Sequence, residues 1–442
     1  MSVTRSGGAL LAVAALGMAG LGWSQPGRAD DGDIVSRPYL FGDWNGTRSR
    51  LEDKGIHFDF GYTNEAGHNF EGGDRQISRA TDQWMGGVKL DLDKLWGWHD
   101  TTFQTIITNR NGRNLDADAG LGNLQQTQEL YGRGQTTWLT RMVLERSFFN
   151  QRLAIKIGRD GENGDFGYSV CDFQSLALCG SNEGNVFGRY WFNWPTSVWM
   201  TRIKYQTSKD TYVQLGVYQQ NPTYIDNEWM RKSAWKINFP GGTTGLILPL
   251  EFGWTPKLNG LSGSYKLGLV FNSAGLPDLY NDVDGQPRAL TGKTAQWHNQ
   301  SYSGYIAVRQ QLTGEDGGKG LDVSVRATTG DRRTSGPISQ QMTVAFEYHS
   351  PFNRPDDIVG LGVAADKASS LQAAYQRMYN ALHPHDAVPF GDSYEYVTEL
   401  FYHWAPLHSL AFQPGLQYIR HVGGSTNTHD AVVVDLKTTI VF

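Results

Sequence analysis

The chain has 442 residues, and 39 lysines and arginines against 44 aspartates and glutamates give it a formal net charge of -5. Charge so nearly balanced provides no basic surface for nucleic acid, and we expect no nucleic-acid partner. The mean hydropathy of -0.44, with no run of about eighteen apolar residues, excludes membrane-spanning helices. The 53 glycines, 14 tryptophans, 20 tyrosines and 20 phenylalanines favour turns and strands.

The first thirty residues have the three-part layout of a secretory signal peptide. A basic start with Arg5 precedes an apolar run over 9–22, and small residues then stand at the two positions that the peptidase reads before Asp30. We predict a signal peptide over 1–29, cleaved after Ala29. A membrane anchor is the alternative, but about fourteen apolar residues are too few to cross a hydrocarbon core of roughly 30 Å.

Residues 30–55 follow as a short lead-in that we place in the periplasm. The segment is too short to fold alone, and its FGDWNG motif carries an aromatic ring and turn residues that could plug or brace the rim of a larger structure.

Runs in which apolar and polar residues alternate fill the rest of the chain, which is the period of a strand. We find sixteen of them, with starts and ends good to a few residues. They cover about 56–64, 84–93, 101–110, 138–148, 152–159, 198–206, 211–218, 246–254, 264–272, 302–312, 320–328, 340–348, 357–365, 394–404, 411–421 and 431–442.

The connections between these runs alternate between long and short for most of the chain. Long outer loops and short periplasmic turns are typical of bacterial outer-membrane barrels, in which an even strand number leaves both termini in the periplasm. A soluble sandwich has no reason to alternate in this way. We therefore predict an all-β fold, a transmembrane antiparallel β-barrel over 56–442 in a Gram-negative outer membrane. Lipid and the outer-membrane assembly machinery are the expected partners, and a homo-oligomer stays open.

The longest connection, 160–197, is the third outer loop of this barrel. It contains Asp165, Asp172 and Arg189, together with two cysteines eight residues apart. In a secreted chain such a pair favours a disulfide between Cys171 and Cys179. We expect the loop to fold inward and narrow the channel, with the disulfide stiffening it. An outside loop held together against proteases is the alternative.

Side chains that do not face lipid should line a water-filled lumen, because sixteen strands leave an aqueous channel. The inward candidates on strands are Tyr218, Lys266, Asp322, Arg326, Glu395, Glu399, Asp435 and Lys437. Their charges largely cancel, which suits neutral polar solutes better than ions. The Tyr218 ring could stack against a sugar. We expect no metal, since no His or Cys pair at ligand spacing accompanies the cysteines, and no cofactor.

The last strand explains why the chain ends on an aromatic residue. Counting back from Phe442, the apolar residues fall on one face, so Phe442 should end a lipid-facing stripe at the periplasmic interface and close the barrel against the first strand. About eleven residues at 3.3 Å, tilted by about 45°, rise roughly 25 Å, the height of the apolar band. Pro414 conflicts with a central strand, and we expect a bulge there.

Several segments also resemble the OprB family of carbohydrate-selective porins. They run from LFGDWNGTRSRLEDKGIHFDFGYTNEAGHNFEGG through LDLDKLWGWHDTTFQ, CDFQSLALCG, NWPTSVW, YVQLGVYQQNP and SYKLGLVFN to PGLQYIRHVGG. The resemblance implies a sixteen-stranded barrel that admits monosaccharides and similar polyols by diffusion, with charged residues, arginine among them, at its constriction. It makes Arg159 a candidate constriction residue, although this residue has the parity of the outward Ile155 and Ile157 and would need a bulge.

Three other functions fit parts of the pattern. An enzyme needs paired groups, but Glu395 and Glu399 on one strand are roughly 13 Å apart, too far for a glycosidase pair, and no G-x-S-x-G or H-E-x-x-H motif is present. A secreted sugar-binding β-domain would lack the loop alternation. A porin for an organic acid or small anion is the serious rival.

Overall fold

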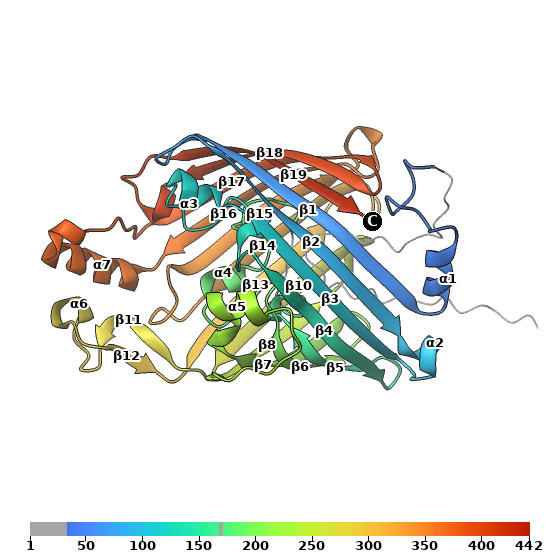
Figure 1. The fold of residues 1–442 in the computed structure, drawn as a ribbon, viewed down its shortest axis with the longest axis horizontal. Helices are drawn as coiled ribbons and strands as arrows, with labels where there is room; N and C mark the ends of the chain where they lie inside the picture. Colours follow the sequence, from blue (N-terminus) through green and yellow to red (C-terminus); the bar gives the residue numbers. More distant parts are fainter. Residues whose placement is uncertain (1–32, 168–170) are drawn as a thin grey trace, which may run out of the picture.

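The computed structural model of the protein describes residues 33–167 and 171–442, and the predicted signal peptide lies outside them. Sixteen antiparallel strands close into the predicted barrel (Figure 1). They are β1 (Ile56–Glu71), β2 (Ser78–Asp91), β3 (Thr101–Gly112), β4 (Thr137–Phe148), β5 (Leu153–Asp160), β6 (Val198–Gln206), β7 (Thr211–Gln220), β8 (Gly245–Trp254), β10 (Leu261–Asn272), β13 (Ser301–Gln311), β14 (Gly320–Thr329), β15 (Ile338–His349), β16 (Ile358–Ala368), β17 (Tyr394–Leu407), β18 (Leu410–Arg420) and β19 (Ala431–Val441).

Besides six short 3-10 turns, the other described elements are α1 in the lead-in before β1 and several in the connections between strands. They are α1 (Thr47–Asp53), α2 (Leu92–Trp96), α3 (Leu115–Ala119), α4 (Asn182–Val186), α5 (Asn227–Ser233), α6 (Arg288–Thr291), α7 (Ser370–Leu382), the two-residue β9 (Lys257–Leu258) and the separate hairpin of β11 (Leu276–Asp282) with β12 (Ala295–His298). Among the described residues, no helix combines the length and apolar character needed to cross a bilayer.

The first and last strands close the ring, as the sequence predicts. β1 pairs with β2 on one side and with β19 on the other, where Gly61 lies opposite Val441. A closed ring leaves no unpaired strand edge in the hydrocarbon, where an unsatisfied backbone group is costly. On β19, Leu436 is 41% exposed on the outer face, whereas Asp435 and Lys437 are buried on the inner face, so the alternation predicted from sequence is confirmed there.

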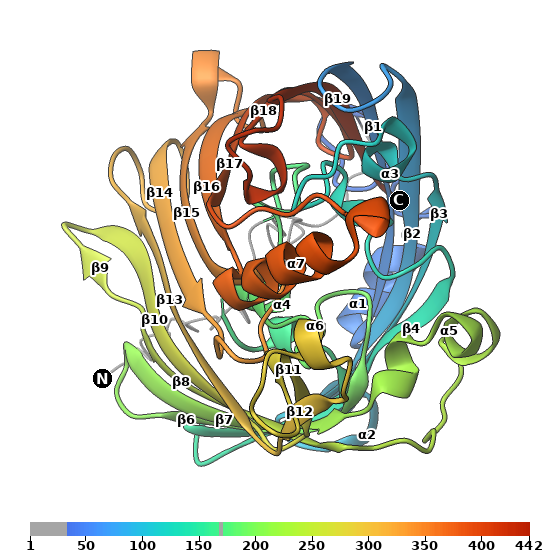
Figure 2. The same ribbon diagram turned by 90° about the vertical axis from the view of Figure 1, so that its left-hand side faces the viewer.

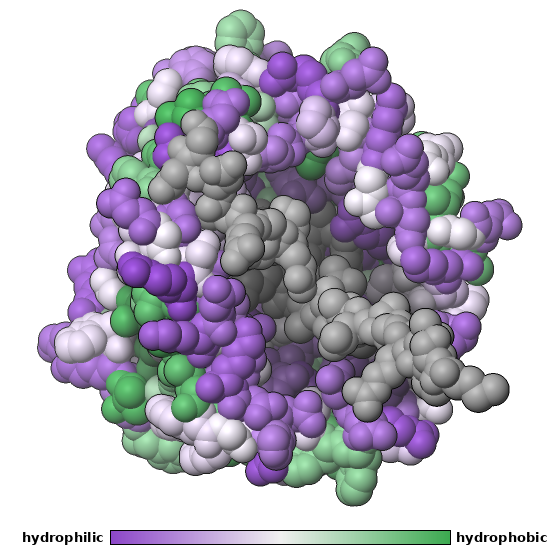
Figure 3. Space-filling view, turned by 90° about the vertical axis from the view of Figure 1, so that its right-hand side faces the viewer, coloured by the Kyte–Doolittle hydropathy of each residue, from purple (hydrophilic) through white to green (hydrophobic). Residues whose placement is uncertain are grey.

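Long loops gather at one end of the barrel and short turns at the other. Figure 1 shows α6, α7 and the β11–β12 hairpin at the long-loop end, opposite α1 and the C-terminus. The long-loop end is the extracellular one in an outer-membrane barrel. Figure 3 views the other end, where hydrophilic residues surround a hollow.

The lead-in packs on the periplasmic rim. Arg48 of α1 donates from Nη2 to the Phe442 carbonyl oxygen (2.8 Å), and the Leu40 amide donates to Val441 O (2.8 Å). The Phe442 ring stacks on Phe41 (centroids 5.1 Å apart) and on Trp84 of the lipid-facing wall (5.8 Å). The terminal aromatic residue therefore belongs both to the outer stripe and to the contact that holds the lead-in.

Two local features differ from the sequence expectation. β1 extends to Glu71 and β2 starts at Ser78, well beyond the predicted 64 and 84, because residues 65–69 and 78–83 are mostly polar or small on both faces and lose the alternation that marks a strand. Pro414 stays in register with Leu436 of β19, and the bulge lies farther along β17, between Trp404 and Leu407. The barrel thus accommodates Pro414 without a bulge at the proline.

Candidate functional site

Loop 161–197 joins β5 to β6, and its described residues, 161–167 and 171–197, lie inside the barrel. Figure 2, viewed from the extracellular end, shows its helix α4 within the ring of strands. Phe187 and Trp191 are buried with Tyr218, Val270 and Tyr305 of β7, β10 and β13. Farther back in the loop, apolar residues pack on β15 to β19 instead; they are Phe173, Ala177 and Leu178, which contact Ala364, Val397 and Phe401 among others. The loop is therefore fastened to two distant sectors of the wall.

Cations on the inner wall bind backbone carbonyls of this loop. Lys266 Nζ donates to Gly167 O (2.6 Å). Arg326 Nη2 donates to Leu178 O (2.7 Å), and its other terminal nitrogen donates to Gly180 O. Lys437 Nζ donates to Cys171 O (2.8 Å) and Phe173 O (3.1 Å). All three cations were predicted to line the pore; they do face inward, but their donors are directed at the loop.

Carboxylates on the same wall bind backbone amides. Glu399 accepts from the amides of Gln174 (2.7 Å) and Ser175 (2.8 Å), one on each oxygen. Glu251 accepts from the Gly167 amide (2.8 Å). Hydrogen bonds to charged groups contribute about 1.5–3 kcal/mol each. Cations on the wall therefore bind the carbonyl groups of the loop, and carboxylates bind its amide groups.

The second outer loop, 113–136, also enters the lumen, which the sequence analysis did not predict. Glu395 accepts from the Leu124 amide (2.9 Å) and Glu65 from the Leu130 amide (3.0 Å). The two inward loops are joined as well, because the Leu176 amide donates to Gln126 O (2.8 Å). The signal available in sequence was loop length alone, and other long connections share it.

An ion-pair cluster fixes the start of loop 161–197. Asp165 lies 2.6 Å from Lys156 Nζ and 3.4 Å from Arg202 Nε, and the Tyr218 hydroxyl donates to it (2.9 Å). Burial raises the pKa of Asp165, but the positive charges of Lys156 and Arg202 lower it more, so the pKa lies below its ordinary value. Asp165 is therefore a permanent anion that ties the loop to β5 and β6.

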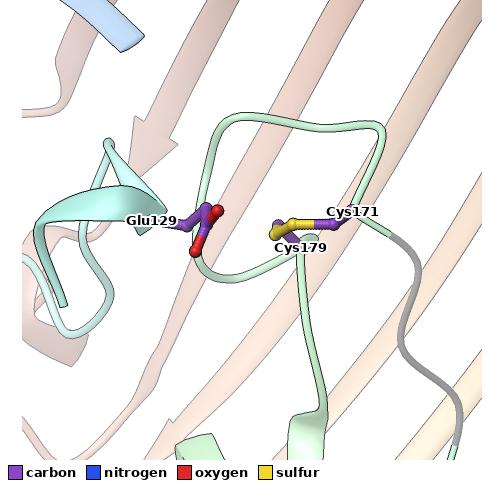
Figure 4. Close-up of side chains that lie close together, drawn as sticks. All are labelled: Glu129, Cys171 and Cys179. Carbon is purple, nitrogen blue, oxygen red and sulfur yellow. A yellow bond between two sulfur atoms is a disulfide. The ribbon is translucent and has the colours of Figure 1, made fainter. Parts of the chain in front are cut away.

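The predicted disulfide joins Cys171 and Cys179. The Glu129 carboxylate of the second loop lies beside it (Figure 4), within 4.8 Å of both sulfur atoms. This grouping is not a metal site in the oxidised protein, because both sulfurs are bonded to each other and neither is the thiolate that a metal requires. The disulfide instead closes the loop segment that Lys437 and Glu399 hold.

The other predicted site residues occupy several environments. Asp322 accepts from Arg309 Nε (2.9 Å), and Asp435 accepts from Gln417 (2.8 Å). Arg189 is exposed in the loop. Tyr218 faces inward but is 0% exposed, edge-on to Phe166, so in this conformation its ring has no free face for a sugar.

Arg159 does not border the channel. It pairs in unbroken register with Met142 and Trp199, so the bulge that would turn it inward is absent. Its guanidinium lies over the Tyr224 ring and donates to Lys236 O (3.0 Å) and Ser197 O (2.9 Å). The alternation of side chains along the strand placed Arg159 on the outer face, in agreement with the structure, whereas the family resemblance placed it at the constriction.

Half-buried charged side chains of both signs face the lumen beside loop 161–197 or stand on it. They are Lys204, Lys266 and Arg309, with Glu145, Asp172 and Asp322. Burial raises the pKa of Asp172, but its hydrogen bond with Glu347 and the charges of Arg309 and Lys437 lower it more, so this group also stays ionised. These six side chains are three cations and three carboxylates.

Comparisons with known proteins agree with this geometry. A family model described as "Carbohydrate-selective porin, OprB family" matches residues 75–442. Porin B of Pseudomonas aeruginosa is 36% identical over 455 residues, covering 99% of this chain and 98% of that protein. The putative porin QuiX of Acinetobacter baylyi is 33% identical over 95% of this chain and 96% of its own. The high-pH structure of Pseudomonas putida OprB superposes with a TM-score of 0.88 at 36% identity, covering 92% of this chain and 99% of that one.

Proposed function

The chain belongs to the OprB family of carbohydrate-selective porins, and from that premise we propose that it passes monosaccharides and similar neutral polar solutes by passive diffusion. It is a sugar channel of the Gram-negative outer membrane and not an enzyme. We further propose that the solute is small and uncharged, and that loops 113–136 and 161–197 form the narrowest part of the channel.

One observation carries the proposal. The inner wall has many charged residues, yet Lys266, Arg326, Lys437 and Glu399 direct theirs at the backbone of loop 161–197. The charged side chains that remain beside the opening carry both signs. This arrangement supports hydrogen bonding to hydroxyl groups rather than attraction of one kind of ion. A neutral polar solute therefore loses the least free energy of hydration on entering the channel.

Liposome swelling tests this proposal. Proteoliposomes are diluted into isosmotic glucose, glycerol or succinate, with protein-free liposomes as the control for leakage. We expect glucose and glycerol to enter faster than succinate. Equal rates for all three would remove the claim of sugar preference while leaving a working channel.

An organic acid or small anion is the second candidate solute. Lys204 is half-buried on the lumen face, and a lysine at a constriction favours anions. Succinate entering faster than glucose in the same assay would establish this alternative.

The closing strand supports a further part of the proposal. We infer that the assembly machinery of the outer membrane inserts the barrel, since β19 completes the ring against β1. Outer-membrane lipid is the partner of the remaining outer face.

A further inference from the structure

Loop 221–244, between β7 and β8, folds over the extracellular rim onto the outside of the barrel. Figure 2 shows its helix α5 outside the ring of strands, next to β4. The loop is hydrogen-bonded to the wall at three points. Arg159 donates to Lys236 O (3.0 Å), Trp199 Nε1 to Asn238 O (2.9 Å) and the Leu139 amide to Ala234 O (3.0 Å). Arg159 and Trp199 are an outward pair on β5 and β6, so the loop covers a wall that would otherwise face lipid.

The segment over 235–239 presents large apolar side chains away from the wall. Trp235 is 51% exposed, Ile237 68% and Phe239 70%, and they alternate with Lys236 and Asn238, whose carbonyls bind the wall. The Phe239 ring lies 6.1 Å from Trp199, which is the second residue of β6. These rings therefore continue the outer wall at the level where aromatic girdles meet the membrane interface.

Cations border the same apolar residues. Arg231, Lys232 and Lys236 are all exposed, and Lys236 Nζ lies 5.6 Å from the Trp235 ring. Lys232 also pairs with Glu228 (2.5 Å). The apolar side of α5 is already occupied, because Met230 and Ala234 are buried against Trp138. Cations beside exposed aromatic and aliphatic side chains are the features of an interfacial segment that binds anionic lipid.

We propose that residues 227–240 are a lipid-binding segment that takes a phosphorylated lipid of the outer leaflet. The acyl chains lie against Ile237 and Phe239, and the phosphates meet Arg231 and Lys236. The continuity of the segment with the lipid-facing wall and its charge favour lipid over a second copy of the chain. The core of a protein interface is depleted of lysine, whereas three cations stand here within six residues.

The first test measures contact with lipid. Ile237→Cys, labelled with a small fluorophore, is reconstituted into phosphatidylcholine vesicles that contain brominated acyl chains. Leu290→Cys is the matched control, because Leu290 is an exposed apolar residue (58%) of α6 at the channel mouth. We expect strong quenching at 237 and little at 290. Absence of quenching at 237 overturns the proposal, and an Ile237→Cys disulfide between two copies would identify the face as a subunit interface instead.

The second test measures the phosphate. Native mass spectrometry counts lipid A or phosphatidylcholine retained by wild type, by Arg231→Glu/Lys236→Glu and by the control Arg332→Glu, which changes an exposed arginine in the turn between β14 and β15. We expect the double variant to lose about thirtyfold in lipid A affinity, since two cations near a lipid surface contribute about 1 kcal/mol each, and Arg332→Glu to behave as wild type. An equal loss in both variants, or in neither, overturns the phosphate contact.

Discussion

Loops 161–197 and 221–244 leave the same end of the barrel from neighbouring strands and settle on opposite sides of its wall. The inner loop is held through its backbone, by Arg326, Lys437 and Glu399. The outer loop is also held through backbone carbonyls, but its own side chains are apolar and exposed. In both loops, backbone polar groups form hydrogen bonds to the wall. The side chains that do not contact the wall therefore decide whether the loop faces water in the channel or lipid outside.

Deleting each loop in turn should give the largest difference in conductance between the inner and the outer loop. Deletion of residues 165–190 should raise single-channel conductance several-fold, because the part that crosses the lumen is gone. Deletion of residues 228–238 should leave conductance unchanged, since that part lies outside the ring. Planar-bilayer recordings measure both. An unchanged conductance after the first deletion would show that the inner loop does not form the constriction.

Substitution of one arginine that binds each loop tests the same difference between the two loops. Arg326→Met removes a buried donor to Leu178 O and Gly180 O and should weaken the seating of the inner loop by about 1.5–3 kcal/mol. We expect a noisier current with a higher mean. Arg159→Met removes the matching anchor of the outer loop and should leave the current as in wild type. A larger change in Arg159→Met than in Arg326→Met would contradict the assignment of the two arginines to opposite faces.

Alkaline pH should loosen only the inner loop. Glu162 accepts from the Phe192 amide (2.9 Å), and its burial raises its pKa to about 8, with Arg133 opposing and Asp160 adding to this shift. An unfolded loop ionises this group near pH 4.3, so the seated loop loses stability as the pH rises from there to about 8 and no further above it. Current noise should therefore be greater at pH 8 to 9 than at pH 6.

Glu162→Gln is the control for this effect, because it keeps the acceptor oxygen without the titration. Its current should be the same at pH 6 and pH 9. A variant that retained the full pH response would show that another group is responsible.

The disulfide should have the smallest effect on conductance. Cys171→Ser/Cys179→Ser removes a short closed loop, which the chain-entropy model values at about 2 to 3 kcal/mol of mainly local stability. Lys437 and Glu399 still bind the same segment, so we expect faster proteolysis of the loop in detergent but little change in current. A conductance as high as that of the 165–190 deletion would show that the disulfide, and not the wall, seats the loop.

Much of the barrel could be predicted from the sequence, and particular residues show why. The alternation around Leu436 and Lys437 fixes an inner and an outer face whatever the rest of the chain does, since successive side chains on a strand point to opposite sides. The same parity placed Arg159 outside, correctly, against the role that the family resemblance gave it. The tips of β1 and β2 were missed because residues 65–69 and 78–83 are mostly polar or small on both faces, so the alternation is lost there.

Alternation, connection length and cysteine spacing were enough to predict the strands, their faces, a long third loop and the disulfide, because these features depend on period, length and neighbouring residues. Only the tertiary structure decided that Glu399 binds the amides of Gln174 and Ser175, more than 220 residues away along the chain. It also decided that Tyr218 is covered and that loop 221–244 lies outside. Such contacts depend on which loop meets which sector of the closed ring, and no local pattern contains that information.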